Sequence, residues 1–152
     1  MRLLLALAAI FATLSLQSIT RADDAAPAAP SDSETPLHRE MEAMNRVLAK
    51  LTRQAKDASK NEASLALVSE LQQHTLACKA LNPAAAATRP SSEQPKYLAD
   101  YRQQMIEVFR QELDLEQQFM AGDNAKAAAT IKAIRQLEKK GHDDFRPKDA
   151  EK

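Results

Sequence analysis

The residues of this chain that could bind a metal centre are its methionines and histidines. The sequence holds five methionines, three histidines and one cysteine. Met41 and Met44 lie near the start of the chain, and His142 lies near its end. A methionine on a helix is usually adaptable core packing, and a histidine in a terminal turn is usually solvated beside the helix dipole. A thioether and an imidazole can also ligate a haem iron from opposite faces, provided that the fold brings them together.

The pattern of residues 37–51 predicts an α-helix that carries Met41 and Met44. Thr35 offers a hydroxyl N-cap and Pro36 suits a first helical turn, so we expect this helix to start there and to run to about Asp57. Its apolar residues recur at steps of four and three, as on one stripe of an α-helix. They are Leu37, Met41, Met44, Leu48 and Leu51.

Three further amphipathic helices are predicted over residues 59–82, 95–121 and 123–146. Ser59 and Glu62 have the spacing of a capping box at the start of the second helix. Gly122 is expected to be the C-cap of the third, and Pro147 to stop the fourth. Glu112 interrupts the apolar stripe of the third helix, and the pattern gives no reason for it.

The sequence predicts an all-α protein, because it contains two glycines and no strand-like alternation. The first and third connections are short, which favours an antiparallel up-down-up-down four-helix bundle over residues 35–147. In this topology the rise of 1.5 Å per residue places five residues in one layer near an open end of the bundle. They are Met41, Cys78, Tyr101, Met105 and His142.

Both ends of the chain are expected to lie outside the bundle. Residues 1–22 have the pattern of a secretory signal peptide cleaved after Ala22, with an uncleaved membrane anchor as the alternative. Residues 23–34 are rich in Ala, Pro, Ser and Asp without an apolar period and predict a flexible leader, and residues 148–152 form a tail. After cleavage we expect no membrane segment.

Charge and composition exclude some functions. Removing Arg2 and Arg21 with the signal peptide leaves 19 basic and 21 acidic residues, a net charge of −2. Only 4% of the chain is aromatic and no basic stripe occurs, so nucleic acid is not an expected partner. Cys78 is the only cysteine, so no internal disulfide can form, and we expect it to be a small buried apolar residue.

Motifs near both ends of the predicted bundle resemble the soluble periplasmic cytochrome b562 family. Leu37, Met41 and Asn45 follow one another at intervals of four, and His142-Asp143-Asp144-Phe145-Arg146 gives a histidine, two polar residues, an aromatic and an arginine. Asp100-Tyr101-Arg102 and the turn at 121–126 are also similar to the family. The resemblance covers roughly residues 36–147.

The resemblance implies one non-covalent haem b per chain, with Met41 and His142 as the axial ligands. No Cys-x-x-Cys-His motif occurs that would attach it covalently. The sequence departs from the family at Met105, where the family has a second aromatic, and at Glu138, where it has an arginine. The pocket positions carried over are Leu37, Asn45, Leu48, Tyr101, Met105, Val108, Ile134, Leu137 and, on the propionate side, Arg146.

The function expected from this resemblance is periplasmic one-electron transfer by a monomer that meets periplasmic redox partner proteins. Filling both axial positions leaves no site for a substrate, so we expect no enzyme activity. One alternative is a haem-free interaction or ligand-binding module with the same fold. Another is a divalent-ion sensor that uses Glu/His pairs four residues apart. These pairs are His38–Glu42, Glu70–His74 and Glu138–His142. Met44 is the rival of Met41 as a ligand.

Overall fold

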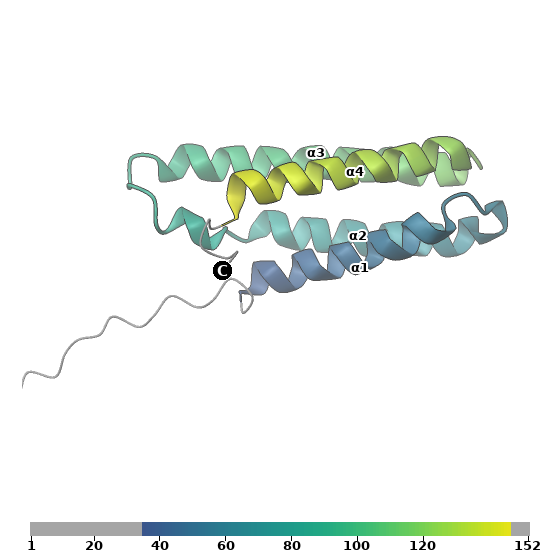
Figure 1. Cartoon of the computed structure of the whole chain (residues 1–152), viewed down its shortest axis with the longest axis horizontal. Coiled ribbons are helices and arrows are strands. Elements are labelled where there is room, and N and C mark those ends of the chain that lie inside the picture. The colour runs from purple at the N-terminus through teal and green to yellow at the C-terminus, as the bar shows by residue number, and fades with distance from the viewer. Residues whose placement is uncertain (1–34, 147–152) are drawn as a thin grey trace, which may run out of the picture.

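The computed structural model describes residues 35–146, and in this part of the chain all regular structure is helical. Successive helices run antiparallel and pack side by side, so the predicted all-α four-helix bundle is confirmed (Figure 1). The predicted signal peptide, leader and tail, and Pro147, lie outside the described residues. The helices are α1 (Pro36–Gln54), α2 (Asn61–Ala80), α3 (Gln94–Met120) and α4 (Asn124–Phe145), with 3₁₀ turns η2 (Ala58–Lys60) and η3 (Ala84–Ala86).

The helix ends follow local capping chemistry. Thr35 Oγ1 accepts a hydrogen bond from the His38 amide at 3.1 Å, as its N-cap position predicts. Asp123 caps α4 in the same way through the Lys126 amide, also at 3.1 Å. Gly122 has φ +71°, the left-handed conformation that a glycine at the end of α3 adopts without strain.

The connection between α1 and α2 differs from the prediction. Helix α1 ends at Gln54, three residues before Asp57, and α2 starts at Asn61 rather than Ser59. The expected capping box does not form, because the Ser59 hydroxyl donates to Asp57 Oδ1 at 2.6 Å and the Ser59 amide donates to the same oxygen at 3.1 Å. Asp57 therefore captures both groups and starts η2 instead.

Helices α1 and α4 contact each other much less than the other neighbouring pairs do. At the end of the bundle where α4 starts, Asn124 Nδ2 donates to Ala55 O and to Asn61 Oδ1, both at 2.7 Å. This side chain links the start of α4 to the end of α1 and the start of α2. Hydrogen bonds therefore tie the α1–α4 seam at this end.

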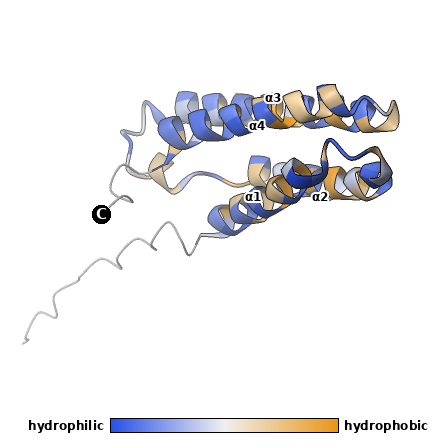
Figure 2. Ribbon diagram, turned by 45° about the vertical axis from the view of Figure 1, so that its right-hand side comes forward, coloured by the Kyte–Doolittle hydropathy of each residue, from blue (hydrophilic) through white to orange (hydrophobic). Residues whose placement is uncertain are grey.

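The core lies between the helices, and their outer faces are mainly polar (Figure 2). One carboxyl group lies within this apolar core: Glu112 of α3 is 0% exposed. Thr75 Oγ1 of α2 donates to Glu112 Oε1 at 2.6 Å, whereas Oε2 has no hydrogen-bond partner among the described residues. Burial raises the pKa of Glu112 from its ordinary 4.5 to about 8, and the Thr75 hydrogen bond opposes that shift.

We expect Glu112 to make stability fall with rising pH. The unfolded chain releases this proton near pH 4.5 and the folded chain near pH 8, so the free energy of unfolding decreases across that window and levels off above it. The expected slope is about 1.4 kcal/mol per pH unit. Urea unfolding at several pH values should show this loss in the wild type and not in Glu112→Gln.

Asp114→Asn is the matched control, because it removes an exposed carboxylate two residues away on the same helix. It should keep the wild-type pH profile. If the free energy of unfolding changed with pH in the same way in the wild type and in Glu112→Gln between pH 5 and 8, the buried carboxyl would not titrate as described.

Candidate functional site

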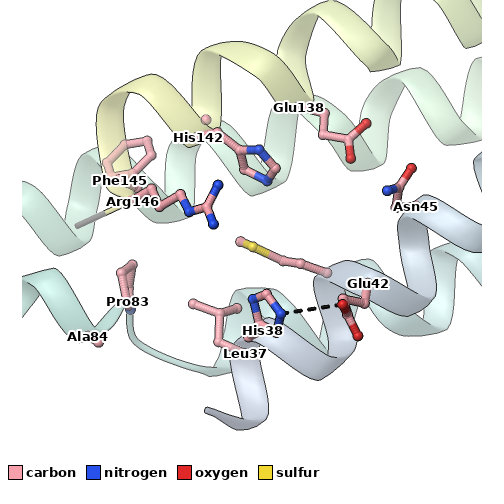
Figure 3. Close-up of a pocket in the computed structure, with 12 residues that line it drawn as sticks. Leu37, His38, Glu42, Asn45, Pro83, Ala84, Glu138, His142, Phe145 and Arg146 are labelled. Carbon is pink, nitrogen blue, oxygen red and sulfur yellow. Dashed lines mark ion pairs between the residues drawn. The ribbon is translucent and has the colours of Figure 1, made fainter. Parts of the chain in front are cut away.

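An open cavity of about 210 Å³ lies at the end of the α1–α4 seam where α1 begins and α4 finishes. Its α1 side carries Leu37, His38, Met41, Glu42 and Asn45, and its α4 side carries Glu138, Gly141, His142, Phe145 and Arg146. Pro83 and Ala84, from the connection after α2, close one side (Figure 3). A deeper cavity of about 50 Å³ shares Met41 and His142 with it.

Met41 and His142, which the sequence places at opposite ends of the chain, line both cavities. Met41 lies in the second turn of α1 and is half-buried, whereas His142 lies in the last turn of α4 and is exposed. The imidazole projects from α4 into the space facing α1 (Figure 3). The site therefore combines a thioether and an imidazole from two helices at an open mouth.

Met44, the rival ligand, has its sulfur directed towards other core groups. Its side chain is buried, and Sδ lies 3.6 Å from Cys78 Sγ, which can donate to it, and 3.7 Å from Thr75 Oγ1, whose hydrogen goes to Glu112 Oε1. Met44 also borders the deeper cavity. Because its sulfur already lies against Cys78 and Thr75 in the core, the geometry favours Met41 as the ligand.

Aromatic residues form the inner wall of the site. Tyr101 is 1% exposed and its hydroxyl donates to Cys78 O at 2.7 Å, and burial raises the pKa of that hydroxyl further above its ordinary value. Phe145 meets Tyr101 edge-on with ring centroids 5.5 Å apart, and meets Tyr97 in the same manner at 5.3 Å. The Tyr97 hydroxyl donates to Phe145 O at 3.0 Å, which holds the end of α4 against α3.

The predicted pocket residues fall into three groups. The outer cavity is lined by Leu37, Asn45 and Arg146. The deeper cavity is lined by Tyr101, Met105, Val108 and Leu137. Two others, Leu48 and Ile134, are fully buried in the core and line neither cavity, so their contact with a ligand stays a prediction.

The predicted pocket residues did not include Pro83 and Ala84, and His38 was expected only as an alternative ligand, not as a pocket residue. His38 precedes Met41 by three residues on the same helical face, so the spacing alone could have identified it. Pro83 and Ala84 follow the end of α2, where no helical period applies. Their position depends on the path of the connection, which only the structure shows.

The structure does not support a divalent-ion site. No group of three or more His, Cys, Asp or Glu side chains among residues 35–146 is arranged to hold a metal ion. Of the predicted Glu/His pairs, His38–Glu42 is in contact at 3.4 Å. His74 instead pairs across the helix interface with Glu40 at 2.7 Å, and Glu138 pairs with Arg135.

Comparison with protein families agrees with this site. The family described as Cytochrome b562 matches residues 36–146 of the chain. The chain belongs to the cytochrome b562 family. Comparisons with curated proteins and with solved structures found no match. In the described part of this cytochrome b562 family member, no helix has the length and apolar character needed to cross a membrane.

The family implies a haem group, and the donor set and the inner wall of the site fit one. Gly141 lines both cavities beside His142, and an added Cβ would meet only Gln104 Cγ, at an ordinary 3.8 Å. Packing within the chain therefore does not demand this helical glycine, whereas a flat ring lying against the backbone would. Because the cavity is smaller than the roughly 300–1,000 Å³ of typical ligand sites, a ring would have to widen the weakly packed α1–α4 seam.

Arg135 of α4 pairs with Glu138, the acidic residue that stands where the cytochrome b562 family has an arginine. Its Nη1 donates to Glu138 Oε2 at 2.8 Å and to Asn45 Oδ1 at 2.5 Å. The arginine therefore joins α4 to α1 beside the outer cavity and offsets the negative charge of Glu138 there. Sequence reasoning identified Glu138 as a departure from the family but not the cation that compensates for it.

We expect Arg135→Gln to weaken haem binding by about two- to fivefold, because a half-exposed ion pair contributes up to ~1 kcal/mol. The variant leaves the negative charge of Glu138 uncompensated beside the outer cavity. Adding Glu138→Gln to the same chain should restore affinity, as measured by haemin titration. Lys132→Gln is the control, since it removes an exposed charge from the same helix, and an equal loss in that control would disprove a specific role for the Arg135–Glu138 pair.

Proposed function

We propose that this protein is a periplasmic one-electron carrier that holds one non-covalent b-type haem between Met41 and His142. The observation that carries the proposal is that a thioether of α1 and an imidazole of α4 line the same open pocket in a member of this family. The absence of a Cys-x-x-Cys-His motif supports non-covalent binding. We expect a monomer that exchanges electrons with periplasmic redox partner proteins after the signal peptide is removed.

The haem supplies a ferric/ferrous couple, and the side chains of this chain set its environment. Met41 offers a soft sulfur ligand that favours the ferrous state and raises the reduction potential. His142 offers an imidazole nitrogen from the opposite side. Tyr101 and Phe145 form an apolar wall that limits water on the inner side. A haem held by both side chains would leave no iron position open for a substrate, which agrees with electron transfer rather than catalysis.

The polar edge of the pocket suits the propionates. His38 and Arg146 line the outer cavity, and Figure 3 shows the Arg146 guanidinium directed into the pocket region near His142. A guanidinium can bind a carboxylate through two parallel hydrogen bonds. We infer that the propionates lie on this solvent side and the apolar ring edge lies towards Tyr101 and Met105.

The optical spectrum of the purified chain with added haemin tests the proposal. The wild type should give sharp, reducible bands of a six-coordinate haem. Met41→Ala and His142→Ala should each lose them and bind haem at least about tenfold more weakly, because each removes an iron ligand. Met44→Leu, which changes the sulfur that faces Cys78, should keep the six-coordinate bands.

Two outcomes would redirect the assignment. Bands that survive Met41→Ala and vanish in Met44→Leu would make Met44 the ligand. A wild-type protein that stays colourless with added haemin would favour the alternative, a haem-free interaction or ligand-binding module. The small cavity volume is the observation that favours that alternative.

A further inference from the structure

The buried Glu112 lies one helical turn below the proposed haem pocket. Met105 and Val108 of α3 line the deeper cavity, and Glu112 follows Val108 by four residues, which is about 6 Å along the helix. The Thr75 hydroxyl that donates to Glu112 also lies 3.7 Å from Met44 Sδ, and Met44 borders the cavity. A continuous set of contacts therefore joins this carboxyl to the pocket.

Among residues 35–146, no cation lies in the surrounding core that could hold Glu112 in its charged form. The buried residues of α1 and α4 are apolar, and among those of α2 only Cys78 is titratable. Burial raises the pKa of the Cys78 thiol to about 12, so it stays neutral. At the α1–α2 surface Glu40 is paired with His74. On α4, Lys132 is exposed and Arg135 is bonded to Asn45 and Glu138.

The charge state of Glu112 is therefore sensitive to any charge placed in the pocket one turn away. Its pKa of about 8 makes both forms accessible near neutral pH. Removing one positive charge roughly 10 Å away, in a medium of effective dielectric about 20, raises a carboxyl pKa by about one unit. Reduction of a haem iron held in the pocket would remove such a charge, so the carboxyl would hold its proton more tightly in the reduced protein.

We propose that Glu112 is a redox-linked proton acceptor, so that the protein takes up a proton together with its electron. The inference rests on the proposed haem-binding function. The electron comes from a reduced partner protein. The proton comes from solvent and forms an O–H bond on the Glu112 carboxylate, with Oε2 as the oxygen that lacks another partner. On oxidation, Glu112 returns the proton to solvent as the electron passes to an acceptor protein.

The midpoint potential of the haem-loaded protein, measured from pH 6 to 10, tests the proposal. In the wild type it should fall with rising pH in a window near pH 8, because the reduced form binds the proton more tightly. A pKa difference of about one unit corresponds to a total fall of roughly 59 mV for a one-electron couple. Glu112→Gln should lack this window, and Asp114→Asn should keep it.

Thr75→Val provides a second variant that leaves the carboxyl in place. It removes the hydrogen bond that lowers the pKa of Glu112, so the window should move to higher pH. Equal pH profiles for the wild type and Glu112→Gln overturn the proposal. A window that does not move in Thr75→Val also overturns it.

The pH dependence of unfolding measured without haem separates this proposal from the proposed function. If the chain takes up no haemin, both proposals fail, although the unfolding profile still reports the titration of Glu112. If haem binds and the unfolding profile shows that titration, but the potential does not depend on Glu112, only the redox-linked proton uptake is wrong.

Discussion

The weak contact between α1 and α4 is the constraint on which the site depends. Three of the neighbouring helix pairs pack closely, whereas this pair is joined mainly by polar links. Asn124 connects the helices at one end, and Arg135 connects them about halfway along. Beyond Arg135, towards the start of α1 and the end of α4, the two candidate ligands line a cavity between the helices. A fully packed fourth interface would bury Met41 and leave no place for a planar group.

Burial distinguishes Met41 from Met44, which the sequence pattern alone does not. Met41 and Met44 lie one turn apart on the same stripe, and either could face a ligand. In the bundle, Met44 reaches the level of Cys78 and Thr75 and fills the core with its sulfur between them. Met41, nearer the open end, packs against the edge of the core and stays half-buried. The difference is one of depth along the helix rather than of chemistry.

Periodicity and rise per residue predicted the four helices and the meeting of Met41 with His142, because both depend only on regular helix geometry. The start of α2 was predicted wrongly, because the hydroxyl and amide of Ser59 both donate to Asp57. Hydrophobic periodicity carries no information about such a local hydrogen bond. Arg135 was missed because a link between α4 and α1 depends on how each helix is rotated about its axis. The cross-helix pair Glu40–His74 was missed for the same reason.

Glu112 is the residue for which packing gives the weakest explanation. Its Oε1 is bonded to Thr75, but a half-satisfied polar pair in a core is usually less stable than an apolar replacement of similar size. At neutral pH the folded chain must hold a proton that the unfolded chain releases, so the residue lowers stability there. A purely structural role would favour leucine, which fills the same volume without that loss. A carboxyl with a pKa of about 8, one turn below the proposed haem pocket, is better explained by coupling to the charge that a haem iron would gain and lose there.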